Sequence, residues 1–527
     1  MNGAQSLLRT LVDCGVDACF MNPGTSEMHF VAALDSVPEM RGVLALFEGV
    51  ATGAADGYAR MADRPAAVLL HLGPGLGNGL ANLHNARKGQ VPVVNIVGDH
   101  ATYHKQFDSQ LESDIETVAR NVSTFIRRSA KTEELAADAA DAIAAAIGPP
   151  GQVATLILPA DVSWSDGGVP VSSLPPRPGG TPPEDANVAA IAAVLRGDLP
   201  VGILVGGRAC RAPALATLGA VAEASGAKLM SETFVARTER GAGVVAPERL
   251  AYLGEMAAAQ LDGLAHLVLV DAKSPVSFFA YPGKPSDLVP DGCRVHTLAG
   301  PGDDVGAALD ALAESVGVAR GRRGALGAPG EPRGGVVRPD LPSGALTTQS
   351  AGAVIGALLP EGAIVSDEAN TSGLFIAAAT ALAPPHDWLM LTGGAIGIGL
   401  PLALGAAVAC PDRRVLALEA DGSAMYTNQA WWTMAREGLD VTNVIFSNRS
   451  YAILNMELHR VGAEAEGPRA KAMLDLSRPD LDFVSLARGM GVPATRADTS
   501  EEFAEQLDRA LNTPGPSVVE AVLASAF

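Results

Sequence analysis

The sequence has few cysteines and few basic residues, and it contains no apolar run long enough for a membrane span. Its five cysteines are scattered over 527 residues without a CxxC pair, which predicts reduced thiols in a cytoplasmic protein. Lysine and arginine total 38 against 58 acidic residues, and the net charge of −20 argues against a nucleic-acid partner. The longest uncharged run, 394–410, is glycine-rich and shorter than the roughly 20 residues of a membrane helix, so no membrane partner is expected. The amino terminus lacks a basic region before an apolar core, so no signal peptide is expected.

What the sequence does contain is enough apolar material for several buried cores, because 48% of its residues are hydrophobic. Short apolar runs alternate with alanine-rich helical stretches in three blocks. This pattern predicts an α/β fold of three doubly wound domains with mostly parallel sheets. We expect the domains at 1–166, 186–318 and 345–527. The proline-rich stretch 167–185 and the Gly/Pro/Arg stretch 319–344 are predicted linkers.

Two polar residues end apolar runs of the third block at a position where such sheets bind ligands. Asp421 ends RVLALEAD, and Asn448 ends TNVIFSN. If the two strands are neighbours, a carboxylate and an amide oxygen lie side by side, and such hard ligands suit Mg²⁺ or Ca²⁺. A helix beginning near Ser423 would direct free N–H groups toward a bound anion. The alternative is that polar residues follow strands only because loops are polar.

The spacing of Asp421 and Asn448 resembles the diphosphate-binding signature of thiamine diphosphate (ThDP) enzymes, and the whole chain resembles the acetolactate synthase and benzoylformate decarboxylase family. The resemblance implies ThDP and Mg²⁺ as cofactors, with the metal held by Asp421, Asn448 and the carbonyl of Ser450. The first glycine of the family signature is Ala420 here, which is tolerable if its φ is negative. Further cofactor contacts are expected from Asn22, Gly24, Asn370, Thr371, Ser372, Gly394, Ile396, Gly422, Ser423 and Tyr451.

Two of these contacts belong to LTGGAIGIGLP, which resembles the loop beneath the bent cofactor in the family. The resemblance places Ile396 between the two cofactor rings and makes the carbonyl of Gly394 the acceptor for the 4′-amino group. An ordinary glycine-rich turn between a strand and a helix is the alternative. In SDEANTSG, residues 370–372 follow a predicted strand, where their side chains could meet diphosphate oxygens.

Glu48 is the candidate catalytic carboxylate. It lies in LALFEGVATGAADGYAR, where an apolar strand meets a helix, so its side chain should be desolvated. By the resemblance, this carboxyl shares a proton with the cofactor pyrimidine and comes from a different subunit than the diphosphate loops. The implied assembly is therefore a homodimer or homotetramer with active sites at the subunit interface. The alternative is a charge that interacts with the helix dipole.

Thr25 and His71 are the candidate substrate-contacting residues. They lie in MNPGTSEMHF and LLHLGPGLGNG, which resemble benzoylformate decarboxylase more than acetolactate synthase. A hydroxyl can bind the 2-oxo acid carboxylate, and an imidazole can relay protons. A structural, hydrogen-bonded histidine is the alternative for His71. The second active-site histidine of that decarboxylase would fall at Ala280, so the relay is incomplete. His100 and His104 match neither relative, and a polar entrance loop is expected there rather than a metal site.

The sequence therefore predicts a ThDP- and Mg²⁺-dependent enzyme that decarboxylates a small 2-oxo acid and ligates the enamine to a second carbonyl, like acetolactate synthase. One alternative is a benzoylformate decarboxylase-like enzyme that releases an aldehyde. Another is a catalytically weak homologue that acts as a partner subunit, which Ala420 and the missing histidine suggest. A nicotinamide oxidoreductase is not expected, because no GxGxxG follows a first strand. Flavin-binding features are not evident, so FAD is not expected.

Overall fold

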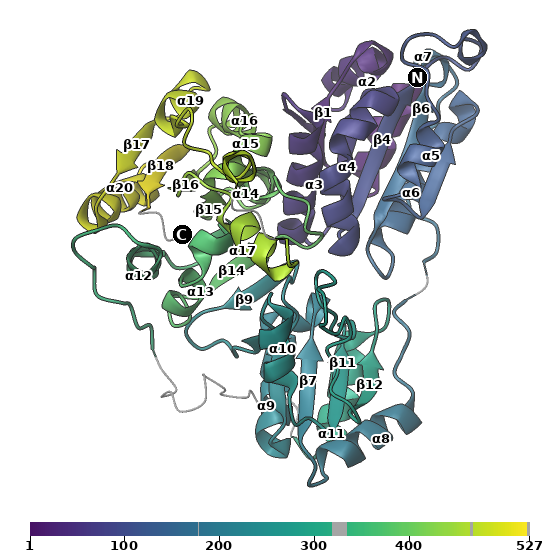
Figure 1. The fold of residues 1–527 in the computed structure, drawn as a ribbon. Coiled ribbons are helices and arrows are strands. Elements are labelled where there is room, and N and C mark those ends of the chain that lie inside the picture. Colours follow the sequence, from purple (N-terminus) through teal and green to yellow (C-terminus); the bar gives the residue numbers. More distant parts are fainter. Residues whose placement is uncertain (178, 319–334, 464–466, 524–527) are drawn as a thin grey trace.

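The computed structural model describes residues 1–177, 179–318, 335–463 and 467–523, and its strands form three sheets. Figure 1 shows the amino-terminal sheet at the upper right, the central sheet at the bottom and the carboxyl-terminal sheet at the left. Helices cover these sheets, as parallel strands that are apolar on both faces require. The predicted fold class, doubly wound and mostly parallel α/β, is confirmed. Part of the second predicted linker, 319–334, lies outside the described residues.

The amino-terminal sheet has the strand order β2-β1-β3-β4-β6-β5, and all of its neighbouring strands are parallel. The strands are β1 (Ala18–Asn22), β2 (Arg41–Leu44), β3 (Ala66–Leu70), β4 (Val93–Asp99), β5 (Phe125–Arg128) and β6 (Val153–Pro159). The helices are α1 (Gly3–Asp13), η1 (Thr25–Glu27), α2 (Met28–Ala33), η2 (Leu34–Ser36), α3 (Glu48–Ala62), α4 (Leu72–Lys88), η3 (Lys105–Phe107), α5 (Ile115–Ala119), α6 (Thr132–Ile147) and α7 (Ala160–Trp164). The carboxyl ends of β1, β2 and β3 therefore lie at the same edge of the sheet, and η1, α3 and α4 begin just beyond them.

The central sheet has the order β10-β8-β7-β11-β12 and is also parallel. Its strands are β7 (Val201–Val205), β8 (Lys228–Ser231), β10 (Glu248–Arg249), β11 (His266–Val270) and β12 (Arg294–Ala299). Its helices are α8 (Asp185–Leu195), η4 (Gly207–Cys210), α9 (Ala212–Ser225), α10 (Gly254–Leu261) and α11 (Val305–Ser315).

The carboxyl-terminal sheet has the order β17-β18-β16-β15-β13-β14-β9. Its strands are β13 (Ile364–Glu368), β14 (His386–Met390), β15 (Val415–Ala420), β16 (Val441–Ser447), β17 (Ala494–Ala497), β18 (Ser517–Val522) and β9 (Arg237–Arg240). Strand β9 comes from the central block and pairs antiparallel with β14, which the sequence did not predict. The helices are α12 (Thr348–Leu358), η5 (Asn370–Gly373), α13 (Ile376–Ala379), α14 (Gly399–Ala409), α15 (Asp421–Thr427), α16 (Ala430–Glu437), α17 (Ala452–Arg460), α18 (Pro468–Ala472), α19 (Phe483–Gly489) and α20 (Ser500–Asn512).

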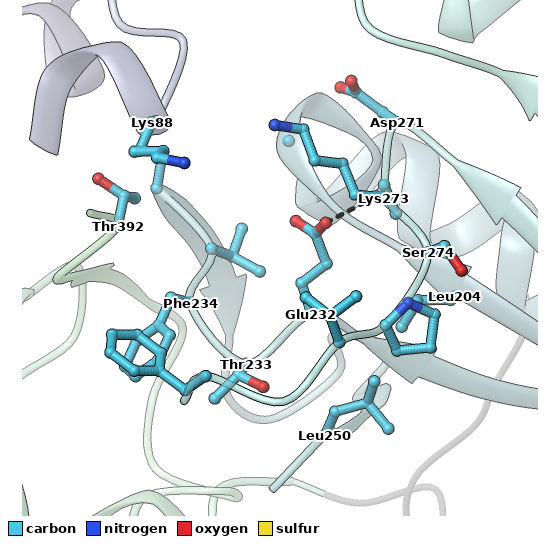
Figure 2. Close-up of a pocket in the computed structure, with 18 of the residues that line it drawn as sticks. Lys88, Leu204, Glu232, Thr233, Phe234, Leu250, Asp271, Lys273, Ser274 and Thr392 are labelled. Carbon is cyan, nitrogen blue, oxygen red and sulfur yellow. Dashed lines mark hydrogen bonds between the residues drawn. The ribbon is translucent and has the colours of Figure 1, made fainter. Parts of the chain in front are cut away.

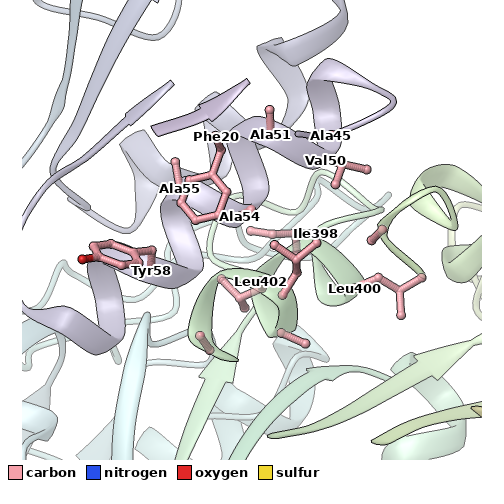
Figure 3. Packing of buried hydrophobic residues seen from close by; sticks show 14 of the residues in the cluster. Phe20, Ala45, Val50, Ala51, Ala54, Ala55, Tyr58, Ile398, Leu400 and Leu402 are labelled. Carbon is pink, nitrogen blue, oxygen red and sulfur yellow. The ribbon is translucent and has the colours of Figure 1, made fainter. Parts of the chain in front are cut away.

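Helices α3 and α14 join the amino-terminal and carboxyl-terminal domains into one apolar core. Figure 3 shows small residues of α3 facing Ile398, Leu400 and Leu402 at the start of α14. A side chain at Gly57 would collide with the backbone of Leu402, so these helices can approach closely only because glycine stands there. The apolar run 394–410 is thus the predicted buried helix behind a glycine-rich loop. Among the described helices, none combines the length and apolar character that crossing a bilayer would require.

Arg60 of α3 fixes the three domains relative to one another. Its guanidinium is bound by the buried Asp56 at 2.6 and 2.8 Å and donates to the carbonyl of Ala236 in the central block. It also donates to the carbonyl of Met390 at 2.7 Å, at the end of β14. A buried charge needs both a counter-ion and hydrogen bonds, and here the hydrogen-bond acceptors come from the two other domains. The contacts of Arg60 therefore connect the amino-terminal and carboxyl-terminal domains, which carry the site residues described next.

Candidate active site

His71 and Glu27 form a buried acid–imidazole pair at the carboxyl edge of the amino-terminal sheet. His71 directly follows β3 and precedes α4, and its Nδ1 lies 2.7 Å from Oε2 of Glu27, whose side chain is fully buried. The same Oε2 accepts from the Gly24 N–H at 2.7 Å. Burial raises the pKa of Glu27, and its contacts with His71 and Gly24 oppose the rise. Because the carboxylate binds Nδ1, the Nε2 of His71 is left for another partner.

The predicted residues Asn22, Gly24 and Thr25 lie at the carboxyl end of β1, which is the neighbour of β3. Asn22 is the last residue of β1, and Thr25 begins η1 with an exposed side chain. A side chain at Gly24 would collide with the imidazole of His71, so glycine is required for this close approach. Thr25 and His71 therefore follow two neighbouring strands at the same edge of the sheet.

Glu48 is the first residue of α3 and is only 8% exposed, which agrees with the predicted desolvation. Its Oε2 accepts a hydrogen bond from Asn78 Nδ2 at 3.0 Å. A β-carbon built on Gly75 would lie 3.4 Å from Oε1 of Glu48 and 3.5 Å from Cβ of His71, so the two side chains flank the same point of α4. Glu48 and His71 thus lie close to one another beside the start of α4, and a carboxyl and an imidazole are groups that can transfer protons.

Asp421 and Asn448 lie side by side, because β15 and β16 are parallel neighbours in the register Ala420 to Phe446. Asp421 Oδ1 accepts from the Gly422 N–H at 2.8 Å, and Oδ2 accepts from the Arg449 N–H at 2.6 Å. Burial raises the pKa of Asp421, and these N–H groups act in the opposite direction. Ala420 has φ −76° and ψ 152°, which any residue adopts. The missing family glycine therefore imposes no strain, which removes one motive for the hypothesis of a weakly binding homologue.

The predicted diphosphate-contacting residues surround these two strand ends. Asn370 Nδ2 donates to Ser423 Oγ at 2.9 Å, so the starts of η5 and α15 meet. Asn448 Nδ2 lies 3.4 Å from the hydroxyl of Ser372. The remaining residues of this group are Thr371 in η5, Gly422 in α15, and Ser450 and Tyr451 between β16 and α17. Together these residues supply a carboxylate, amide groups and hydroxyls at helix starts. Such groups fit a divalent cation that also carries phosphate oxygens.

Gly394 and Ile396 lie in the turn between β14 and α14. Gly394 has φ +75°, a conformation that favours glycine, and Ile396 packs against the core shared by α3 and α14. Asn85 of α4 binds this turn from the amino-terminal domain, with its Nδ2 donating to the Ala395 carbonyl at 2.8 Å. The turn is thus held between the amino-terminal and carboxyl-terminal domains.

Sequence reasoning missed Glu27 and Asn78. The available signal for Glu27 was its place three residues after Gly24, where an acid can cap a turn. Nothing in the sequence showed that this acid would lie under His71, which is 44 residues away. Asn78 lies on α4 one turn after Gly75, and its contact with Glu48 depends on how α3 and α4 pack.

His100 and His104 lie in the segment that contains η3. Their ring centroids are 5.3 Å apart, and His100 Nε2 lies 3.1 Å from the hydroxyl of Ser109. Among the described residues, no group of three histidine, cysteine, aspartate or glutamate side chains could hold a metal. The predicted metal site is not of that kind, because it uses one acid, one amide and one carbonyl.

A cavity of about 260 Å³ is lined by residues of all three domains (Figure 2). Phe278 and Thr392 line it beside the turn between β14 and α14, and Glu232 and Asp271 line it just after β8 and β11. Glu232 Oε1 accepts from the Lys273 N–H at 2.8 Å. Burial raises the pKa of Glu232 to about 7 and that of Asp271 to about 6.

The raised pKa of Glu232 predicts a pH-dependent stability. The folded state keeps the proton up to about pH 7, whereas the unfolded chain releases it near its ordinary value of about 4.3. The stabilisation is therefore complete below that value and is lost as the pH rises through 7. We expect the melting temperature of wild type to fall more between pH 5 and 8 than that of Glu232→Gln in calorimetric scans. The exposed control Glu505→Gln should follow wild type, and parallel curves for all three proteins would contradict the prediction.

Comparisons with known proteins match both the amino-terminal and the carboxyl-terminal parts of the chain. Residues 1–120 match the family description "Thiamine pyrophosphate enzyme, N-terminal TPP binding domain", and residues 371–521 match the corresponding C-terminal TPP binding domain. The chain is 59% identical over its full length to a Mycobacterium tuberculosis protein, IlvX, named provisionally as an acetolactate synthase large subunit, of which 99% is covered. It is 28% identical to the benzoylformate decarboxylase of Pseudomonas aeruginosa, with 96% of each chain covered.

A solved structure also resembles this fold. The ThDP-dependent 4-hydroxybenzoylformate decarboxylase of Rhodococcus jostii RHA1 superposes with a TM-score of 0.85, at 22% identity and with 99% of each chain covered. At that identity the likeness supports the three-domain fold only.

Proposed function

Because the chain belongs to the family of thiamine diphosphate-dependent enzymes, we propose that it decarboxylates a small 2-oxo acid and joins the remaining carbons to a second carbonyl compound. The observation that favours ligation over simple decarboxylation is Ala280. This residue is exposed in the central domain beside Phe278 and Phe279, where the resemblance places a second proton-relay histidine. Because fewer proton donors lie at that position, the decarboxylated substrate is protonated more slowly. A second carbonyl compound therefore has time to react with it.

In the proposed mechanism, Asp421, Asn448 and the carbonyl of Ser450 hold Mg²⁺, and the starts of η5 and α15 bind the diphosphate. When bound, ThDP supplies an electron-accepting thiazolium ring that makes loss of CO₂ from a 2-oxo acid possible. Glu48 holds and returns a proton at the aminopyrimidine, since its buried carboxyl can exchange one without competition from water. Thr25 orients the substrate carboxylate, and Nε2 of His71 moves a proton to or from the substrate oxygen.

The functional unit is proposed to be a homodimer or a larger homo-oligomer. Within the described residues of one chain, no hydrogen bond or ion pair joins the Glu48–His71 group to the Asp421–Asn448 group. Large apolar side chains near both groups are exposed, which indicates surfaces that another subunit covers. They are Met28, Leu46, Phe107, Leu374, Tyr426 and Met473. The five free cysteines favour a cytoplasmic location.

A second candidate is simple decarboxylation to an aldehyde, and the Glu27–His71 pair favours it. A buried acid that fixes the imidazole makes His71 an effective proton donor even without a second histidine. Incubation with ThDP and Mg²⁺ separates the candidates: pyruvate should yield acetolactate if ligation dominates, whereas benzoylformate should yield benzaldehyde if decarboxylation does. Both candidate activities would be contradicted if the protein consumed neither pyruvate nor benzoylformate and showed no saturable ThDP binding in calorimetric titration.

Glu27 is expected to act through His71. Glu27→Gln should lower kcat by about 10- to 100-fold, because a neutral amide no longer fixes the proton on Nδ1. His71→Ala should lower kcat at least as much, and the double variant should be no worse than His71→Ala alone. The measurement is kcat against pH for the three variants. If the losses from Glu27→Gln and His71→Ala multiplied in the double variant, the two residues would act independently and this prediction would be wrong.

A further inference from the structure

A loop of the central domain, residues 276–287, contacts the turn between β14 and α14 of the carboxyl-terminal domain. Its base is closed by two backbone hydrogen bonds: Ser277 N–H donates to Ser286 at 2.8 Å, and Leu288 N–H donates to Pro275 at 3.1 Å. The loop carries Phe278, Phe279 and Ala280 with exposed side chains. Because the base of the loop is fixed by these hydrogen bonds, a change in the position of the loop moves the three side chains together.

The first contact of this loop is made by Phe278, which packs against Gly394 in the turn between β14 and α14. A β-carbon built on Gly394 would lie 2.6 Å from Cζ of Phe278, so the ring rests on that glycine. Ring centroids of Phe234, Tyr252 and Phe279 lie 5.7, 5.4 and 4.8 Å from that of Phe278. Such aromatic contacts hold Phe278 from the central-domain side.

The second contact is Arg460, the last residue of α17. Its guanidinium donates two hydrogen bonds to Glu255 of α10, at 2.8 and 3.0 Å, and lies 4.4 Å from the ring centroid of Tyr281. Lys284 of the same loop binds Glu255 at 2.6 Å. A bidentate pair combined with a cation–π contact fixes geometry as well as distance. Tyr281 is 7% exposed, so this contact is well packed.

Helix α17 links Arg460 to the predicted metal site. It begins directly after Tyr451, and Asn455 Nδ2 donates to Ser450 Oγ at 2.9 Å. It also packs near η5, which carries the predicted diphosphate contacts. A rigid helix therefore runs from Ser450 at one end to the loop of the central domain at the other.

We propose that Arg460 is a positioning residue, which holds loop 276–287 as an apolar wall beside the cofactor site and thereby selects 2-oxo acids with an uncharged, apolar acyl group. The inference rests on the proposed function for its substrate class. Residues 276–283 carry no cation, and Lys284 and Arg460 are both engaged by Glu255. A second carboxylate that reached residues 276–283 would meet aromatic rings and find no cation within that segment.

Hydrogen exchange followed by mass spectrometry tests the positioning role without any turnover. Arg460→Gln and the partly exposed Glu255→Gln should both increase exchange in 276–287, whereas Arg460→Lys should do so less. Arg509→Gln, which breaks an exposed pair with Glu505 on α20, is the matched control and should leave the loop unchanged. Unchanged exchange in both Arg460→Gln and Glu255→Gln would overturn the positioning role.

Kinetics with ThDP and Mg²⁺ tests the selection of substrate. Arg460→Gln should raise KM for pyruvate or benzoylformate about tenfold, with kcat and the ThDP dissociation constant changed less than threefold. Wild type should use 2-oxoglutarate at least about 100-fold less efficiently than its better monocarboxylic substrate. Equal efficiency with 2-oxoglutarate, or an unchanged KM in Arg460→Gln, would overturn the inference. Failure of wild type to bind ThDP would instead overturn the proposed function, while the exchange result would still decide the role of Arg460.

Discussion

Replacing Glu48 with glutamine is expected to lower turnover by about 100- to 10,000-fold while ThDP still binds. Glutamine keeps the size of the side chain and can still contact Asn78, which bonds Oε2 at 3.0 Å. It cannot hold or release a proton at the aminopyrimidine. The loss should therefore appear in kcat, and the dissociation constant of ThDP should change by less than about tenfold.

The control for Glu48→Gln is Glu39→Gln in the same domain. Glu39 pairs with Arg9 at the surface, and its loss should leave kcat unchanged. Product formation gives kcat, and calorimetric titration gives the affinity for ThDP. If Glu48→Gln kept more than a tenth of the wild-type kcat, Glu48 would be a helix-start charge rather than the catalytic carboxylate.

The sequence predicted the inner strands of each sheet but missed four edge strands. The inner strands are continuous apolar runs, because both of their faces are buried. Strands β5, β9, β10 and β17 read FIRR, RTER, ER and ATRA, and each lies at an edge of its sheet. An edge strand has neighbours on one side only, so charged residues are tolerated and the apolar signal is lost.

The same physics explains which site residues could be predicted. Asp421 and Asn448 follow apolar runs, and parallel strands deliver their ends to one edge, so their proximity follows from local pattern. Glu27 and Arg460 contact His71 and Glu255, which lie 44 and 205 residues away in the chain. Such contacts depend on how helices and domains pack. No local pattern encodes that packing, so these two residues emerge only from the structure.

Removing the carboxylate of Asp421 is expected to weaken binding of ThDP with Mg²⁺ by about 100-fold or more. Asp421→Ala eliminates one proposed metal ligand and also leaves the N–H groups of Gly422 and Arg449 without their acceptor. The effect should appear as a raised dissociation constant for ThDP in titrations at fixed Mg²⁺. Excess Mg²⁺ should restore part of the affinity, because Asn448 and Ser450 remain.

Ala420→Gly is the matched control for Asp421→Ala, since it changes the neighbouring residue to the one found in the family signature. Ala420 already has φ −76°, so glycine relieves no strain there and ThDP affinity should stay within about twofold of wild type. A large gain from Ala420→Gly would mean that the alanine impairs the site. Retention of ThDP affinity by Asp421→Ala would mean that the ends of β15 and β16 do not hold the metal. If Asp421→Ala loses ThDP affinity and Ala420→Gly does not, the result supports a metal site at the ends of β15 and β16.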